Sequence, residues 1–291
     1  MRSSECINEY TQFLSDIRHK SKNTIEAYHR DVVKYAEFVT RNYGVDIDEA
    51  TEPMASAYLV ALRDSGKSDA TVSRVVASLR SFRLFLSGDS AGRMAFSKPK
   101  REKKLPCVLT HPEIERLLAA PPIHTDKGIR DKAMLELLYA TGIRVSELIG
   151  MDISDIDVVA GFIICRGTRH DRLIPLGRSA ADAAANYIDT VRDRMAHADE
   201  KALFVNTKGG RMSRQGFWKI IKHYGEMSGI RRDITPHTLR HSFAAHLVQN
   251  GADLESLREM MGHATIASTQ IYSLIPSEHI RDVYDRAHPR A

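Results

Sequence analysis

The last quarter of this 291-residue chain contains side chains suited to phosphoryl transfer. It reads Thr-Pro-His-Thr-Leu-Arg-His over 235–241, Met-Gly-His over 261–263 and Thr-Gln-Ile-Tyr over 269–272. Arginine and histidine side chains donate hydrogen bonds to phosphate oxygens, and a tyrosine hydroxyl can act as a nucleophile. The candidate site residues in this region are His237, Arg240, His263 and Tyr272.

An isolated arginine earlier in the chain completes the set. Arg144 lies in the run Ala-Thr-Gly-Ile-Arg-Val-Ser-Glu-Leu, where Gly142 lets the chain turn sharply after a predicted helix. Glu147, three residues further on, is placed to hold the guanidinium by a bidentate pair. Singly, each candidate has an ordinary explanation, such as a surface turn for Arg144 or a packed core for Tyr272. Together they supply anion-binding groups, a nucleophile and proton donors for one site.

A predicted helix positions the first of these residues. Thr235 can cap its start, and Pro236 suits the first turn because it has no amide hydrogen to leave unpaired. His237 and Arg240 then lie three residues apart on one helix face. The positive end of the helix dipole also favours an anion there.

These motifs resemble those of the tyrosine recombinase/integrase family. The run around Arg144 resembles the first arginine box of that family, and His-Thr-Leu-Arg-His-Ser-Phe with Met-Gly-His and Gln-Ile-Tyr resembles the second. The stretches at 21–24 and 288–291 resemble the Xer branch, whose members resolve chromosome dimers. The resemblance runs through the chain in order and spacing, and it implies a site-specific recombinase that acts at a terminus site.

The resemblance also implies a role for each candidate. Tyr272 is expected to attack the scissile DNA phosphate and form a 3′-phosphotyrosyl bond, while Arg144 and Arg240 hold the non-bridging oxygens. His237 and His263 are expected to donate hydrogen bonds or to handle the proton of the nucleophile. Because the ester keeps the bond energy, no cofactor, metal or ATP is expected.

The chain departs from the family pattern in one predicted hairpin. The family usually places a lysine there as the general acid, but the turn here reads Arg-Gly-Thr-Arg-His-Asp-Arg over 166–172. Arg169 falls at that place when counted from the first strand, and His170 when counted back from the second. Arginine is a poor proton donor, whereas histidine donates well near neutral pH. By position, we favour Arg169 as the sixth catalytic residue.

Other functions remain open at this point. A phage or mobile-element integrase would use the same chemistry, and a type IB topoisomerase would share the tyrosine–arginine site. The missing lysine also leaves room for a DNA-binding regulator that has lost catalysis. Covalent trapping on a nicked substrate separates an enzyme from a regulator.

The hydrophobic pattern predicts a mainly α fold with one small antiparallel β-sheet and two domains. Residues 1–92 are expected to form a helical core-binding domain, 93–106 a basic linker, and 107–291 the catalytic domain. The resemblance implies a clamp around double-stranded DNA that carries a recombination site. It further implies a homotetramer on two duplexes, joined by a tail helix over 276–286, and an activating partner such as a translocase.

Composition agrees with a DNA-binding protein but does not single one out. The net charge is +5 and 43% of the residues are hydrophobic, as in ordinary globular proteins. No stretch approaches a membrane span or a secretory signal, and the three cysteines are too widely spaced for a zinc site or disulfides. We therefore expect a cytoplasmic protein without a metal.

Overall fold

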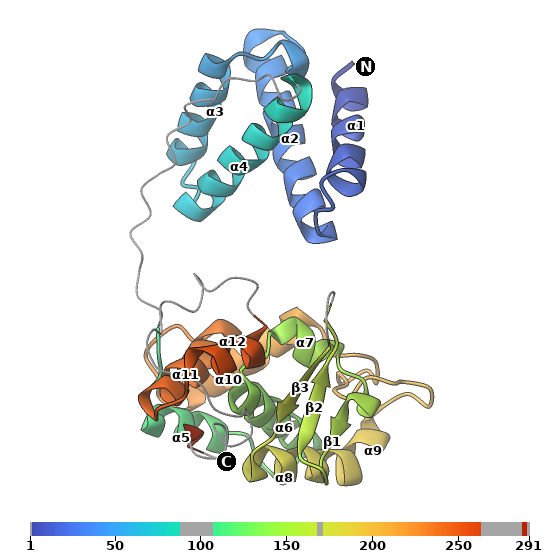
Figure 1. Ribbon diagram of the computed structural model, residues 1–291, viewed down its shortest axis with the longest axis vertical. Helices are drawn as coiled ribbons and strands as arrows, with labels where there is room; N and C mark the ends of the chain where they lie inside the picture. The colour runs from blue at the N-terminus through green and yellow to red at the C-terminus, as the bar shows by residue number, and fades with distance from the viewer. Residues whose placement is uncertain (1, 88–106, 168–170, 263–286, 290–291) are drawn as a thin grey trace. The chain divides into compact units, whose positions relative to one another are not determined.

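The computed structural model describes residues 2–87, 107–167, 171–262 and 287–289 (Figure 1). The chain divides into two compact units, residues 1–104 and 105–291, and each has its own hydrophobic core. The predicted linker over 93–106 and tail helix over 276–286 lie outside the described residues.

The N-terminal unit is helical. Ser21 caps the start of its longest helix by accepting from the Thr24 amide, and Gly44 ends that helix at a φ of 70°. Apolar side chains at helical spacing then bury one face of each helix against the others. The elements are α1 (Arg2–Asp16), α2 (Lys22–Tyr43), the 3-10 turn η1 (Ile47–Glu49), α3 (Glu52–Asp64) and α4 (Asp69–Ser87).

One ion pair lies at the edge of this helical core. Asp31 on α2 is 4% exposed and accepts from Arg74 Nη2 on α4 at 2.9 Å and from Ser78 Oγ at 3.2 Å. Burial raises the pKa of the Asp31 carboxyl, and the Arg74 guanidinium opposes that shift. The pair therefore joins α2 to α4 at the cost of a desolvated carboxylate.

The C-terminal unit packs helices around a small sheet. Its helices are α5 (His111–Ala119), α6 (Asp126–Thr141), α7 (Val145–Gly150), α8 (Arg178–Tyr187), α9 (Asp193–Met195), α10 (Arg214–Met227), α11 (Pro236–Gln249) and α12 (Leu254–Met261), with a 3-10 turn η3 (Ile153–Asp155) and a π-helical turn η4 (Ile188–Arg192). Its strands are β1 (Ile156–Asp157), β2 (Phe162–Cys165) and β3 (Arg172–Pro175). They pair antiparallel in the order β1-β2-β3, with Cys165 opposite Arg172.

Helix α6 forms the centre of this unit, and both α8 and α11 pack on it (Figure 1). Its side chains are buried on nearly every side, so it lacks the polar face of a surface helix. Gly142 ends it at a φ of 59° with its amide bonded to the Leu138 carbonyl, which directs the chain towards Arg144. Helix α6 therefore leads from the core directly to one candidate site residue.

A group of aromatic and imidazole rings joins α6 to α11. Tyr139 Oη lies 2.9 Å from His246 Nδ1, and the His111 ring stacks on His246 at 3.9 Å between centroids. Burial lowers the pKa of His246 to about 4, and the nearby His111 acts in the same direction. His246 is thus a neutral core residue at physiological pH.

The predicted fold class is confirmed: the structure is mainly helical with one small antiparallel sheet. Thr110 and Glu113 form a capping box at the start of α5. The hairpin over β2 and β3 was predicted, whereas the two-residue strand β1 was not. Among the described residues, no helix is long and apolar enough to cross a bilayer.

Candidate active site

Arg144 is the N-cap of α7 and is held by its own helix. Its Nη1 donates to Glu147 Oε1 at 3.1 Å, and its backbone amide donates to Glu147 Oε2 at 2.6 Å. The predicted Arg144–Glu147 pair is present, but it is not bidentate because the second carboxylate oxygen caps the backbone. The Arg144 side chain remains 42% exposed, so a phosphate can reach its guanidinium.

Arg240 on α11 is buried, whereas His237 near the start of the same helix is exposed. Arg240 donates from Nη1 to the Gly142 carbonyl and from Nη2 to the Met261 carbonyl at 2.6 Å. Their spacing predicted that both lie on one helix face, and it did not distinguish their exposure. The difference arises because Arg240 bends towards carbonyls contributed by distant parts of the chain.

The carboxyl end of α12 brings the two candidate arginines together. Arg240 Nη2 bonds to the Met261 carbonyl, and Arg144 Nη2 bonds to the next carbonyl, that of Gly262, at 2.7 Å. The last carbonyls of a helix have no partners within the helix and carry partial negative charge, which favours cations. The two arginines are therefore held at neighbouring peptide groups, directly before His263 in the sequence.

A third arginine, Arg172 at the start of β3, reaches the same helix end. It donates from Nη1 to the Met260 carbonyl and from Nη2 to Glu147 Oε1. Arg172 was not among the residues predicted for the site, because it ends the polar turn over 166–172. Strand alternation carried a signal, because Arg172 shares its strand face with the buried Ile174 while Leu173 is 63% exposed.

We call Arg144, Arg172, Arg240 and Glu147 the arginine cluster. Three guanidinium groups against one carboxylate leave it with a net charge of +2. Such a concentration of fixed donors can stabilise the charge that builds up on a phosphoryl group in its transition state. Arginine suits this role because its planar fork matches phosphate geometry and keeps its proton.

Two further groups lie beside the cluster. Burial lowers the pKa of His241, and the nearby His237 and Arg240 lower it further, which favours a neutral imidazole. Cys165 is 1% exposed, and burial followed by the nearby Glu147 raises the pKa of its thiol to about 12. Cys165 is therefore a neutral packing residue and not a nucleophile.

Three predicted site residues lie outside the described part of the chain: Arg169, His263 and Tyr272. The alternative hairpin residue His170 lies outside it as well. The structure thus brings together Arg144 and Arg240 and places His237 at the start of the helix that carries Arg240. Over the described ranges, no three His, Cys, Asp or Glu side chains are grouped as metal ligands.

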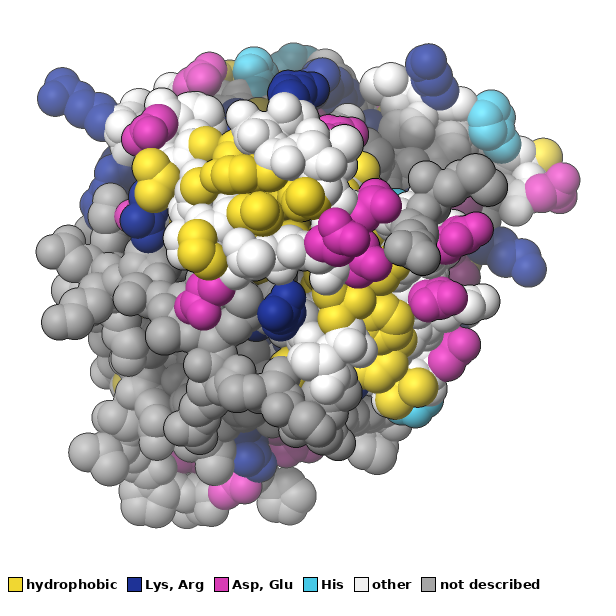
Figure 2. Space-filling model, turned by 90° about the horizontal axis from the view of Figure 1, so that it is seen from above, with side chains coloured by type: hydrophobic (Ala, Val, Ile, Leu, Met, Phe, Trp, Pro, Cys, Tyr) yellow, Lys and Arg dark blue, Asp and Glu magenta, His cyan; other side chains and the backbone are white. Residues whose placement is uncertain are grey.

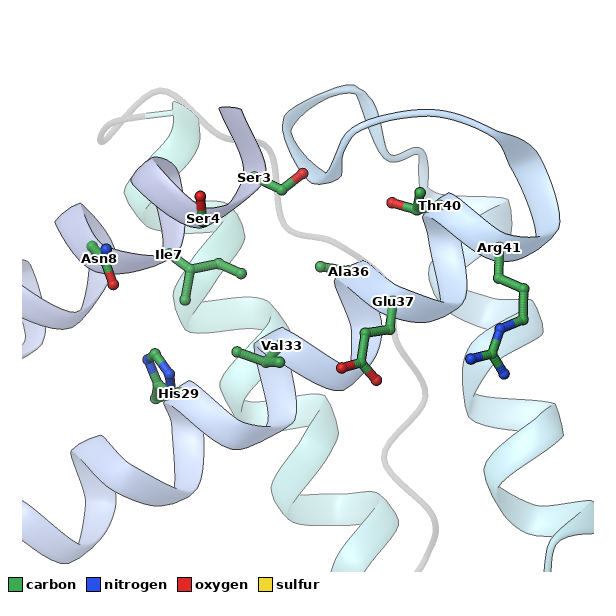
Figure 3. Close-up of a pocket in the computed structure, with 10 residues that line it drawn as sticks. All are labelled: Ser3, Ser4, Ile7, Asn8, His29, Val33, Ala36, Glu37, Thr40 and Arg41. Carbon is green, nitrogen blue, oxygen red and sulfur yellow. The ribbon is translucent and has the colours of Figure 1, made fainter. Parts of the chain in front are cut away.

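The N-terminal unit contains a separate groove of about 590 Å³ between α1 and α2. Figure 3 shows Ile7 facing Val33 and Ala36 across it, with Glu37 and Arg41 farther along α2. Figure 2 shows the molecule from above, where exposed hydrophobic side chains are bordered by acidic ones. None of the residues that line this groove is a candidate for phosphoryl transfer, so the groove is not part of the site.

Known protein families and relatives match this chain over nearly its whole length. Residues 107–278 match the phage integrase family, and residues 7–88 match its N-terminal SAM-like domain. The chain is 42% identical to tyrosine recombinase XerD of Oceanobacillus iheyensis, over 98% of both chains. It is 41% identical to tyrosine recombinase XerD of Staphylococcus epidermidis, over 98% of this chain and 99% of the relative.

The chain belongs to the tyrosine recombinase family. It is a site-specific recombinase that cuts and rejoins DNA, as the sequence analysis predicted.

Solved structures agree with this family. A crystal structure of XerA recombinase is 26% identical, with a TM-score of 0.54 over 99% of this chain and 100% of that chain. XerH bound to its difH substrate is 21% identical, with a TM-score of 0.72 over 96% of this chain and 86% of that chain. The Tn1549 transposon integrase in complex with circular intermediate DNA is 18% identical, with a TM-score of 0.75 over 95% and 97%. The last two show the shared fold.

Proposed function

We propose that this recombinase resolves chromosome dimers by exchanging strands between two copies of one DNA site. The observation that supports the proposal most is the convergence of Arg144 and Arg240 on the Met261 and Gly262 carbonyls, directly before His263 in the sequence. This convergence provides an anion-binding centre next to the segment that carries Tyr272. Relatives named XerD match over nearly the whole chain, which favours this role over that of a mobile-element integrase.

In the proposed reaction, the Tyr272 oxygen attacks the scissile phosphorus and the bond to the 5′-oxygen breaks. The product is a 3′-phosphotyrosyl ester and a free 5′-hydroxyl, and the reverse reaction with a partner strand rejoins the DNA. Arg144 and Arg240 hold the non-bridging oxygens and stabilise the extra charge of the transition state. The phosphotyrosyl ester conserves the energy of the broken phosphodiester bond, so ligation needs no nucleotide cofactor.

Protons have to leave the phenol and reach the departing oxygen. An unperturbed tyrosine has a pKa of about 10, so its proton is lost only as the attack proceeds. We assign His237 and His263 to this proton handling and to hydrogen bonds with the phosphate. Arg169 steadies the charge on the leaving oxygen, because arginine stays protonated, while His170 is the alternative donor at the same turn.

The proposal extends to the assembly and its location. We infer a homotetramer on two double-stranded DNA sites, joined through the segment over 276–286, with each site sensing its neighbour around a closed ring. Affinity for DNA falls steeply with salt because phosphate contacts dominate it. A translocase that brings the two sites together is the expected partner, and the reaction takes place in the cytoplasm, where the chromosome lies.

A nicked suicide substrate tests the chemistry. The unaltered protein is expected to become covalently attached to DNA that carries its site, whereas Tyr272→Phe binds the same DNA without attachment. Plasmids with two terminus-region sites then test the role, because the unaltered protein should recombine them. A regulator would bind without covalent attachment in either form. Relaxation of single-site plasmids as the sole activity would instead point to a topoisomerase.

A further inference from the structure

Arg172 is less exposed than Arg144, the other arginine that bonds to Glu147. Its side chain is 14% exposed, whereas that of Arg144 is 42% exposed. It donates hydrogen bonds to two protein groups, the Met260 carbonyl and Glu147 Oε1. These bonds hold Arg172 between the end of α12 and the carboxylate that also binds Arg144.

Glu147 links Arg172 to Arg144. Its Oε1 accepts from both guanidinium groups, and its Oε2 accepts from the Arg144 backbone amide. One carboxylate thus ties the start of α7 to the start of β3. Since Glu147 is itself only 14% exposed, it has little freedom to turn once both arginines bind it.

Gly262 shows how closely Arg172 packs against the end of α12. A Cβ at Gly262 would lie 2.6 Å from Arg172 Cζ, which is closer than van der Waals contact allows. Gly262 also has a φ of 62°, the conformation that glycine adopts without strain. The guanidinium therefore lies flat against the peptide that leads into His263, where a side chain would displace it.

We propose that Arg172 is a positioning residue of the strand-cleavage reaction, which acts through Glu147 and the end of α12 to aim the Arg144 guanidinium at the scissile phosphate. The inference rests on the proposed function above. By joining β3, α7 and α12, Arg172 also connects the hairpin that carries Arg169 to the chain that leads to Tyr272. Misplacement of a reacting or stabilising group by about 1 Å can cost roughly 100-fold in rate.

Arg172→Lys tests the role because lysine keeps the charge but cannot bond to Glu147 and Met260 with a planar fork. With a nicked suicide substrate, the rate of covalent attachment under single-turnover conditions is expected to fall about 10- to 100-fold. The Kd for DNA should stay within about twofold, because lysine keeps the positive charge and the bonds of Arg172 run to Met260 and Glu147.

Arg192→Lys is the matched control. Arg192 is a buried arginine of the same unit, and it donates to the Ala202 and Glu200 carbonyls with no contact to the cluster. Its replacement should lower the Tm while leaving the rate of attachment unchanged. Arg172→Lys could instead behave like Arg192→Lys, with a lower Tm and an unchanged rate of covalent attachment. In that case Arg172 has only a structural role and the inference is wrong.

The Arg144→Ala background provides the decisive comparison. If Arg172 acts through Arg144, then Arg172→Lys should cost no more than about twofold once Arg144 is gone. If the rate loss in the double variant equals the product of the two single losses, the inference is wrong. Should Arg172→Lys fail to fold, Glu147→Gln takes its place and should show the same dependence on Arg144. Absence of covalent attachment by the unaltered protein would overturn the proposed function, and this inference with it.

Discussion

Gly142 occupies a position where the structure allows no side chain. It ends α6 at a φ of 59°, and an added Cβ would lie 2.2 Å from Cδ1 of Phe243, a fully buried core residue. Its carbonyl also accepts from Arg240 Nη1. Gly142→Ala is therefore expected to destabilise the C-terminal unit and to disturb a candidate site residue at the same time.

The loss in free energy of unfolding caused by Gly142→Ala has two separable parts. An alanine in the left-handed conformation costs about 1–2 kcal/mol. Forcing a methyl group into a well-packed core costs about 1–3 kcal/mol more. The sum of about 2–5 kcal/mol corresponds to a Tm lowered by roughly 5–15 °C for a unit of this size.

Gly161→Ala is the control that removes the second part. Gly161 has a φ of 72°, but the nearest atom to its added Cβ is the Leu176 carbonyl oxygen at 3.7 Å, an ordinary contact. Both replacements remove the same freedom from the unfolded chain, so that effect cancels in the difference. Chemical denaturation of both variants should give a free energy of unfolding that is about 1–3 kcal/mol lower for Gly142→Ala.

A second background tests the identity of the clash. Phe243→Ala removes the three ring atoms nearest the added Cβ, so Gly142→Ala made in that background should cost no more than Gly161→Ala does. Equal costs for the two glycine replacements in the unaltered protein would refute the reasoning. An unchanged cost of Gly142→Ala beside Phe243→Ala would show that the aromatic ring is not the obstacle.

Two further predictions concern buried ionisable groups. Arg74→Ala leaves the buried Asp31 carboxylate without its cation. It should lower the free energy of unfolding by about 1–2 kcal/mol at pH 7. Chemical denaturation measures this loss, with Arg63→Ala as the control. The loss depends on an ionised Asp31, whose folded pKa lies above 3.8 and would rise further in Arg74→Ala, so it should disappear as the pH falls below the folded pKa in the unaltered protein. A loss that persists at pH 3.8 would contradict this cause. For His246, the folded pKa of about 4 lies below the unfolded 6.5, so the unfolded state binds more protons between them and stability should fall by up to about 3 kcal/mol as the pH drops through that range. His246→Gln should remove this pH dependence, and an unchanged slope would assign it to another group.

The sequence predicted the local elements well. The helix start at Thr235 and the helix end at Gly142 follow from chemistry within a few residues, and the structure has both of them. The hairpin followed from two short apolar runs around a polar turn. Strand β1 did not, because two residues carry no periodicity and are ordered only by pairing with β2.

The candidate site was predicted by residue type but not by contact. The burial of Arg240 depends on the Gly142 and Met261 carbonyls, 98 and 21 residues away, and nothing near Arg240 in the sequence signals them. Arg172 was missed because its partners also come from other elements. Long-range contacts of this kind are set by tertiary packing, which local pattern does not encode.

The cluster at the end of α12 is made almost entirely of groups that do not titrate. Guanidinium groups keep their protons under biological conditions, and peptide carbonyls do not acquire them. Acidification or alkalinisation of the cell would therefore leave the positive charge of the three guanidinium groups nearly constant. In the proposed function, a change in cellular pH then alters neither the charge nor the number of hydrogen-bond donors that the three arginines offer to the DNA phosphate.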